Sequence, residues 1–273
     1  MGVMQGRLLP KYQERYQAHP LGRWQEEFKI AKDLGLDCIE FILDYNDAEK
    51  NPLLTEAGIK EILAVCQGTQ VNVRTICADY FMVAPLHAED DAVAALSLEI
   101  LQRLIIAAVK LNVTDIVIPC VDQSTLADDN AVSRFISQIK PIILELEEKK
   151  INLSLETDLA PAPFVALLDQ INSKRITVNY DIGNSAALGY DPEQELDAYG
   201  HRITDVHIKD RLFQAGPVIL GEGSANFKRF FDKLKSFNYT GPFIMQAYRD
   251  DEGVQVFKKQ LEWVQPYLNQ LNG

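Results

Sequence analysis

Two kinds of hydrophobic pattern alternate along this chain. Short runs rich in β-branched and aromatic residues recur at steady spacing. They predict strands at residues 2–5, 38–43, 71–77, 115–120, 151–156, 176–181, 204–209 and 242–247. Several of these runs are almost continuously apolar, which is typical of strands covered on both faces, as in a parallel sheet.

Between the strands, apolar residues repeat every three or four positions, and this period predicts helices. The repeat is clearest over residues 91–111, over 131–148 and in the last segment, from Val254 to Leu268. Pro141 is expected to kink the second of these helices, because proline removes a backbone donor and clashes with the preceding turn. The apolar stripes are the faces that the helices would bury against the sheet.

The number of units favours one fold. Eight strand–helix units in 273 residues average about 34 residues each, with no linker between them. A (β/α)8 barrel typically takes about 250 residues. The alternative, an open doubly wound sheet, would show a glycine-rich phosphate loop after an early strand, and "MQGRLLPKY" is not such a loop. We therefore expect an α/β fold with a single TIM-barrel domain over residues 1–273.

Charge and cysteine content narrow the classes of partner and location. The formal net charge is −12, which repels polyanions and argues against nucleic acid and anionic membranes as partners. The four cysteines form no CxxC pair, which is typical of a reducing compartment. We see no signal-peptide pattern and expect no apolar stretch long enough to span a bilayer. The expected location is the cytoplasm. The sequence does not determine the oligomeric state, and a homo-oligomer is one option.

Polar residues end four consecutive predicted strands, where a barrel places its active site. They are Glu156, Asp181, His207 and Gln246. A barrel curves these ends toward one centre, and the resulting O, O, N, O donor set suits Mn²⁺ or Mg²⁺ before Zn²⁺, with Co²⁺ able to substitute. Each residue also has an ordinary explanation, such as a turn, a cap or a pair with Lys209. All of these would have to hold at consecutive strand ends, so we predict a metal site.

The segments "SLETD", "NYDIGN", "VHIKDR" and "GEGSANF" resemble the xylose isomerase-like TIM-barrel superfamily, specifically its sugar phosphate isomerase/epimerase branch. The resemblance covers the whole chain. It implies a metal-dependent isomerase or epimerase that acts on a ketose or ketose phosphate through an enediolate. Glu156, Asp181 and His207 match the family's metal ligands, and Glu156 is expected to transfer a proton. The fourth family ligand is a Glu, where this chain has Gln246.

Further residues are expected to act on the substrate. By the resemblance, Glu40 matches an acidic residue that often ends the second strand, and Arg211 lies near the place of a substrate-binding Arg in ketose epimerases. Lys209 follows the metal-binding His and is expected to act in catalysis and to help hold the substrate's oxygens. Either Glu156 works alone or a second group transfers a proton, and for that group the sequence leaves open Asp79, Tyr80, Lys209 and Glu40.

Three substrate contacts are expected from position alone. Arg7, after the first strand, could hold a phosphate or carboxylate, or form a surface salt bridge. Asp79 lies at the rim of the third strand. Glu222 lies between two glycines that permit close backbone approach to a ligand, or simply a flexible turn.

Gln246 keeps other functions open, because an amide cannot exchange a proton near neutral pH. One alternative is a non-catalytic sugar-binding protein, and another is a lyase or dehydratase that works with one base. A nuclease of the endonuclease-IV kind needs several His ligands, whereas this chain has four His in all and an acidic surface. We therefore expect a small sugar or sugar phosphate as the partner.

Overall fold

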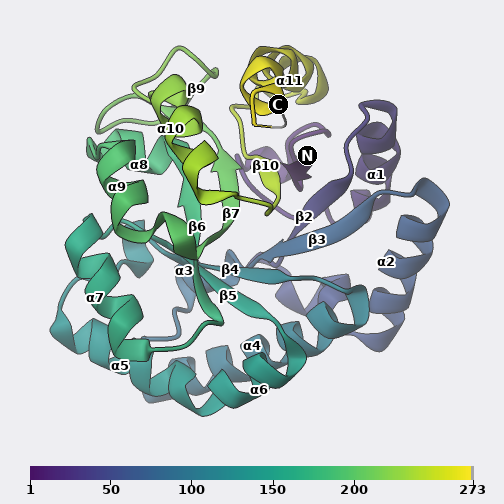
Figure 1. Ribbon diagram of the computed structural model, residues 1–273. Coiled ribbons are helices and arrows are strands. Elements are labelled where there is room, and N and C mark those ends of the chain that lie inside the picture. The colour runs from purple at the N-terminus through teal and green to yellow at the C-terminus, as the bar shows by residue number, and fades with distance from the viewer. Residues whose placement is uncertain (272–273) are drawn as a thin grey trace.

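Eight parallel strands close into a barrel in the computed structural model, which describes residues 1–271 (Figure 1). Asn272 and Gly273, the last residues of the predicted domain, lie outside the described residues. The strands follow one another around the barrel in the order β1-β10-β7-β6-β5-β4-β3-β2. Their bounds are β1 (Gly2–Met4), β2 (Cys38–Ile42), β3 (Asn72–Cys77), β4 (Asp115–Cys120), β5 (Asn152–Thr157), β6 (Ile176–Asp181), β7 (Ile203–Ile208) and β10 (Phe243–Met245). The predicted TIM barrel is confirmed, and every strand end lies within two residues of its predicted position.

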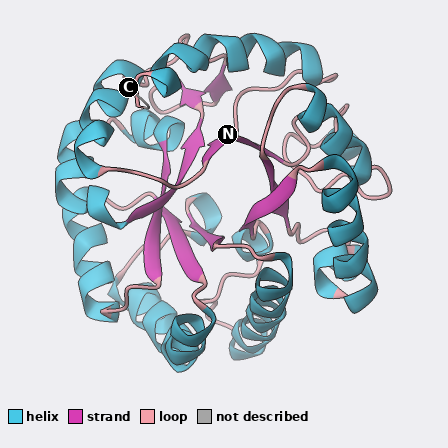
Figure 2. Ribbon diagram, turned by 45° about the vertical axis from the view of Figure 1, so that its right-hand side comes forward, coloured by secondary structure: helices cyan, strands magenta, loops and turns pink. Residues whose placement is uncertain are grey.

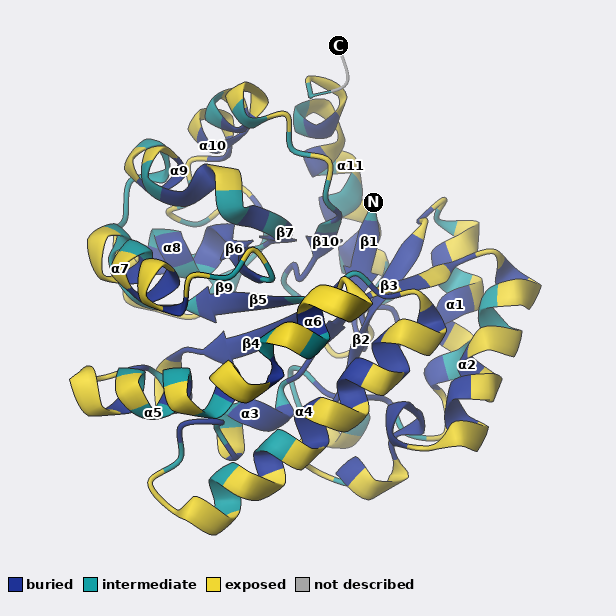
Figure 3. Cartoon of the chain, turned by 60° about the horizontal axis from the view of Figure 1, so that its bottom comes forward, coloured by how far each residue is buried: buried dark blue, intermediate teal, exposed yellow. Residues whose placement is uncertain are grey.

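Helices form a ring outside the strands (Figure 2). They are α1 (Trp24–Asp33), α2 (Glu56–Thr69), α3 (Tyr80–Val83), α4 (Asp91–Leu111), α5 (Asp129–Ile139), α6 (Ile143–Lys149), α7 (Pro161–Ile171), α8 (Ile182–Leu188), α9 (Pro192–Tyr199), α10 (Phe227–Leu234) and α11 (Val254–Asn269). Their inner faces are buried and their outer faces exposed (Figure 3), as the apolar stripes predict. The expected break at Pro141 is present, since a short 3-10 turn over Lys140–Ile142 separates α5 from α6.

Helix α4 corrects one expectation from the sequence. Its 21 residues are long and apolar enough, by length and composition, to cross a membrane. The helix nevertheless packs against the barrel, and Leu101, Leu104 and Ile105 have no exposed surface. Helices packed in a protein core can be as long and as apolar as a membrane span. A single helix of this kind is therefore weak evidence that the chain crosses a membrane.

The interior of the barrel is packed rather than open. Buried side chains from five strands fill part of it: Met4, Cys38, Ile42, Cys77, Val117 and Ile244. The strand register also sets which polar residues meet, because paired residues on neighbouring parallel strands point to the same face. Asp181 on β6 is paired with His207 on β7, and Glu40 on β2 is paired with Thr75 on β3.

A short hairpin follows β7 and was not predicted from the sequence. It pairs β8 (Asp210–Arg211) with β9 (Pro217–Val218) in antiparallel fashion. Two-residue strands carry too little apolar pattern to be found by periodicity. The hairpin places Arg211 beside the carboxyl end of the barrel.

Candidate functional site

Three of the predicted ligands come together at the carboxyl ends of neighbouring strands. Glu156, near the end of β5, Asp181, at the end of β6, and His207, on β7, each offer an atom, and these atoms lie within 4.8 Å of one another. All three residues are buried. The Nδ1 atom of His207 and the Oδ2 atom of Asp181 are 4.0 Å apart, too far for a hydrogen bond but suitable for two ligands of one cation.

Asp181 does two things at once. Its Oδ1 atom accepts a hydrogen bond of 2.8 Å from the backbone N–H of Asn184, so it caps helix α8. Its Oδ2 atom faces the site and lies 3.2 Å from Nζ of Lys209. The two sequence interpretations, a cap and a ligand, are therefore compatible. The lysine pairs with Asp181 and not with Glu156.

The glycine of the "DIGN" segment permits this approach. A Cβ atom on Gly183 would lie 2.8 Å from Cγ of Lys209 and 3.0 Å from its backbone carbon. Such distances are too short for real side chains, so any larger residue would push Lys209 away from Asp181. The motif thus positions the lysine as well as the aspartate.

Asn184 connects Glu156 to Arg211, a role that the sequence analysis missed. Its Nδ2 atom donates a hydrogen bond of 2.5 Å to Oε1 of Glu156, and its Oδ1 atom accepts one of 2.8 Å from Arg211. Burial, and then the neighbouring carboxylate of Asp181, raise the pKa of Glu156. The sequence did carry a signal for Asn184, because this residue ends the "NYDIGN" segment, three residues after Asp181.

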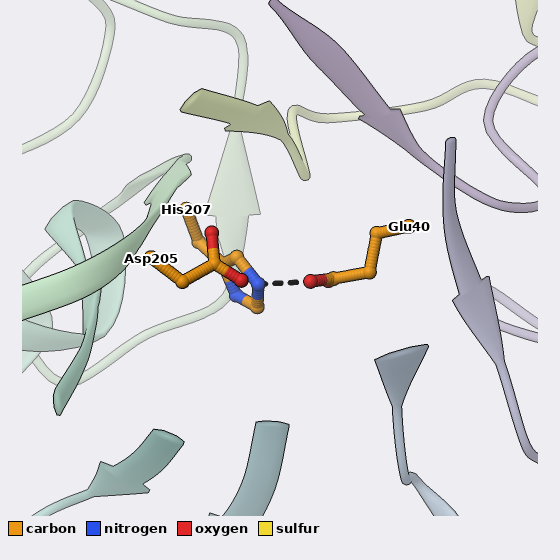
Figure 4. A group of neighbouring side chains, drawn as sticks. All are labelled: Glu40, Asp205 and His207. Carbon is orange, nitrogen blue, oxygen red and sulfur yellow. Dashed lines mark ion pairs between the residues drawn. The ribbon is translucent and has the colours of Figure 1, made fainter. Parts of the chain in front are cut away.

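His207 is supported from across the barrel by Glu40 (Figure 4). Its Nε2 atom lies 2.8 Å from Oε1 of Glu40, whose other oxygen accepts a hydrogen bond from Thr75. A carboxylate at Nε2 leaves Nδ1 of the ring to face the candidate site, the usual arrangement around a metal-binding histidine. Glu40 has no exposed surface, so its position does not support the expected direct contact with a substrate.

Asp205, which the sequence analysis did not single out, lies beside this pair. Its two carboxyl oxygens are buried without a hydrogen-bond partner. Burial raises the pKa of Asp205, and it raises the pKa of Glu40 to about 7. The neighbouring charge of Glu40 raises the pKa of Asp205 further.

Gln246, the expected fourth ligand, lies one residue beyond the end of β10. Its Nε2 atom donates to Oε1 of Gln17 at 3.2 Å, while its own Oε1 atom is buried without a hydrogen-bond partner. The Nδ1 atom of His207 is likewise buried and without such a partner. Buried polar atoms of this kind are costly unless a cation or a polar ligand group receives them. The donor set therefore fits a divalent cation.

Arg7 and Asp79, two of the expected substrate contacts, are engaged within the protein. Arg7 is 1% exposed and donates hydrogen bonds to the backbone oxygens of Ala247 and Tyr16 and to Oε1 of Gln17. It is therefore neither a surface salt bridge nor a free anion-binding group. Asp79 accepts hydrogen bonds from Nε2 of Gln17 at 2.7 Å and from the thiol of Cys77 at 3.2 Å.

Arg211 borders a cavity of about 260 Å³ at the carboxyl end of the barrel. The cavity is lined by Val121, Asp122, Asp158, Asn184, Ala187, Leu188, Arg211 and Gln214. Since Asn184 also contacts Glu156, the cavity adjoins the candidate ligands. A larger cavity, of about 750 Å³, opens at the opposite end of the barrel, and none of the predicted site residues lines it.

Glu222 is exposed, and the loop that carries it is held by the side chain of Asp210. Asp210 accepts hydrogen bonds of 2.9 Å from the backbone N–H groups of Gly221 and Gly223. It accepts a third from Ala225 at 3.1 Å. A Cβ atom on Gly223 would lie 2.1 Å from Oδ1 of Asp210. Gly223 therefore admits the buried carboxylate of Asp210, which anchors the loop.

Comparisons with known proteins bear on the fold and the family of the chain. A family model described as "xylose isomerase-like TIM barrel" matches residues 28–267. The L-ribulose-5-phosphate 3-epimerase UlaE of Salmonella paratyphi A is 30% identical over 245 residues, which is 85% of each chain.

Two solved structures share the fold. The 3-keto-D-glucoside 4-epimerase YcjR from E. coli has a TM-score of 0.74 at 17% identity, over 97% of this chain and 98% of that one. A xylose isomerase-like TIM-barrel protein from Mycobacterium smegmatis, in complex with magnesium, has a TM-score of 0.71 at 19% identity, over 93% and 90%. At these identities the likeness concerns the fold.

Proposed function

Since the chain belongs to the xylose isomerase-like TIM-barrel family, we propose that it is a metal-dependent epimerase or isomerase of a ketose or ketose phosphate. An activity of the sugar epimerase/isomerase class is supported by the relatives, which are named as 3-epimerases of L-ribulose 5-phosphate. The observation that carries the metal-dependent reaction is the buried Glu156, Asp181 and His207 cluster at three strand ends. The four free cysteines support the expected cytoplasmic location.

The cation would be held by Glu156, Asp181 and His207, with the amide oxygen of Gln246 as a fourth ligand. Three oxygen donors and one imidazole favour Mn²⁺ or Mg²⁺ over Zn²⁺, and Co²⁺ could substitute. Such an ion would supply Lewis-acid polarisation of the substrate carbonyl and so lower the cost of an enediolate.

Glu156 is proposed to accept the proton from the carbon next to the carbonyl. Its place for this role is given by its position at the end of β5, beside the other two candidate ligands and next to the cavity that Asn184 lines. The Nδ2 atom of Asn184 holds one of its oxygens and so orients the carboxylate. Asn184 in turn accepts a hydrogen bond from Arg211. Both residues line the cavity, so Glu156 lies next to it.

Lys209 is proposed to be the second proton-transfer group, because epimerisation returns a proton to the opposite face of the same carbon. Its ammonium group lies 3.2 Å from Asp181 and its side chain keeps 14% of its surface exposed. The other acidic candidates are less suitable. Glu40 is fully buried beneath His207, and the oxygens of Asp79 are engaged by Gln17 and Cys77.

We propose that Arg211, at the cavity wall, contacts the substrate directly. Arg7, Glu40 and Asp79 are proposed to support the site from positions where they contact other residues of the protein. Glu222 is exposed on its loop, and its contact with the substrate stays a prediction.

A one-base lyase or dehydratase is the second candidate, and Gln246 is the observation that favours it. An amide has no pKa suited to proton exchange near neutral pH, so the site lacks one carboxylate of its relatives' pattern. Both reactions begin with removal of the proton next to the carbonyl. They differ in the product, which is an epimer or isomer in one case and a dehydrated compound in the other.

Incubation of the Mn²⁺-loaded protein with ketoses and ketose phosphates in D₂O tests the proposal. We expect deuterium at the carbon next to the carbonyl, together with the epimer or isomer, detected by NMR. His207→Ala should abolish the exchange. Loss of water would instead support the lyase, and tight binding without exchange would support a sugar-binding protein; either result would overturn the proposed reaction.

A further inference from the structure

We propose that Gln17 is a positioning residue that sets the orientation of the Gln246 amide, so that its oxygen and not its NH₂ group faces the cation site. The inference rests on the proposed function in one respect, namely that a cation binds there. Gln17 lies in the loop after β1, far from Gln246 in sequence, and neither composition nor motif marks it as part of the site.

The argument begins at Arg7, because a guanidinium group can only donate hydrogen bonds. One of its nitrogens, Nη2, lies 2.8 Å from the side-chain oxygen of Gln17. The oxygen and nitrogen of an amide have nearly the same shape, so their partners decide which points where. Arg7 therefore assigns Oε1 of Gln17 to its own side.

Asp79 assigns the other end of the same amide. Its Oδ2 atom lies 2.7 Å from Nε2 of Gln17, and its Oδ1 atom accepts the thiol of Cys77. Both carboxyl oxygens are thus acceptors, and Gln17 must present its NH₂ group to them. A donor on one side and an acceptor on the other hold Gln17 in a single orientation.

Gln246 inherits its orientation from Gln17. The side-chain oxygen of Gln17 also lies 3.2 Å from Nε2 of Gln246, and an acceptor there requires the NH₂ group of Gln246. The Oε1 atom of Gln246 then points away from Gln17 and is buried without a partner. If the amide flipped, two acceptors would face each other at Gln17, and an N–H group would face the cation.

The residue at position 246 and the residue at position 17 are therefore matched. A carboxylate at 246 has two acceptor oxygens, and one of them would face Oε1 of Gln17. Glutamine at 17 should thus favour cation binding when residue 246 is Gln and oppose it when residue 246 is Glu. A residue with a purely structural role would act in the same direction in both cases.

A double-mutant cycle tests the inference. Mn²⁺ affinity is measured by calorimetry for the wild type, Gln17→Met, Gln246→Glu and the double variant, since methionine keeps the length of glutamine without its polar atoms. Partners of metal ligands typically change affinity by about 10–100-fold. We expect Gln17→Met to weaken Mn²⁺ binding about tenfold in the wild-type background and to tighten it in the Gln246→Glu background.

Controls separate this inference from the proposed function. Gln260→Met removes another buried amide, on helix α11, which accepts a hydrogen bond from the backbone of Leu220 and donates one to that of Tyr248; it should leave Mn²⁺ affinity unchanged. Melting temperatures confirm that each variant is folded, and Gln17→Ala repeats the cycle with a smaller side chain. Gln17 changes that act in the same direction in both backgrounds, or in neither, would overturn the inference alone. Mn²⁺ binding that survives His207→Ala would overturn the metal site itself and the inference with it.

Discussion

At the scale of single residues, the site depends on side chains whose partners lie far away in the sequence. The candidate ligands Glu156, Asp181 and His207 could be found from sequence, because each ends or nearly ends a recognisable strand. Asn184, Asp205 and Gln17 could not, since their contacts depend on the closing of the barrel. Glu40 was found, but its expected role changed once its burial beneath His207 was known.

Arg211→Ala should raise KM without changing metal content. Arg211 borders the cavity next to the candidate ligands, and a charged hydrogen bond to a substrate contributes about 1.5–3 kcal/mol. We expect an increase in KM of about tenfold or more, measured with any substrate found in the D₂O assay. Unaltered kinetics would place the substrate's oxygens elsewhere.

Asn184→Ala should lower kcat more than it changes KM, because Asn184 orients Glu156 through a hydrogen bond of 2.5 Å. Misplacement of a general base typically costs about 10²-fold in rate. Steady-state kinetics at saturating Mn²⁺ would show this effect. An unchanged kcat would mean that Glu156 needs no orientation by Asn184.

At the scale of elements, the periodic segments were predictable and the short ones were not. The eight strands and the long helices carry enough apolar residues to reveal their period, and Pro141 marks a break that the structure contains. The β8–β9 hairpin is held by a few contacts, chiefly those of Asp210, rather than by an apolar face. The glycines of "GEGSAN" are compatible with a flexible turn, but Asp210 anchors this loop through hydrogen bonds that the composition does not reveal.

Gly223→Ala should destabilise the fold through this loop. A Cβ atom would lie 2.1 Å from Oδ1 of Asp210, so the carboxylate would have to leave one or more backbone N–H groups. We expect a loss of about 1–3 kcal/mol in urea unfolding, the cost of an unsatisfied buried group.

Gly216→Ala, in the turn between β8 and β9, is the matched control, because a Cβ atom there would meet nothing within 4 Å. It should leave the unfolding midpoint nearly unchanged. Equal effects of the two substitutions would show that Asp210 does not anchor the loop.

At the scale of the whole molecule, barrel closure buries acidic groups whose protonation couples to stability. Glu27 is fully buried and accepts backbone hydrogen bonds from Gly6 and Leu8. Burial raises its pKa from the ordinary 4.5 to about 7. The folded protein therefore binds more protons than the unfolded chain between these values, and the stability from this group is present below pH 4.5 and lost as the pH rises through 7.

Glu27→Gln should flatten the fall in stability between pH 5 and pH 7, because it removes one group that binds a proton on folding. The largest change in slope is about 1.4 kcal/mol per pH unit. Urea unfolding of metal-free protein at several pH values would measure this slope. The variant should also be less stable overall, because a backbone N–H group that donates to Glu27 would face the NH₂ group of Gln. A slope identical to that of the wild type would mean that Glu27 is ionised in the folded protein at pH 5.

The central claim is that Glu156, Asp181 and His207 hold one divalent cation at the carboxyl end of the barrel. Titration of metal-free protein with Mn²⁺, in the wild type and in His207→Ala, tests it most directly. The account predicts one ion per chain in the wild type, and none bound at the same concentration by a His207→Ala variant that still unfolds cooperatively. A folded His207→Ala variant that binds a full equivalent of Mn²⁺ with unchanged affinity would contradict it.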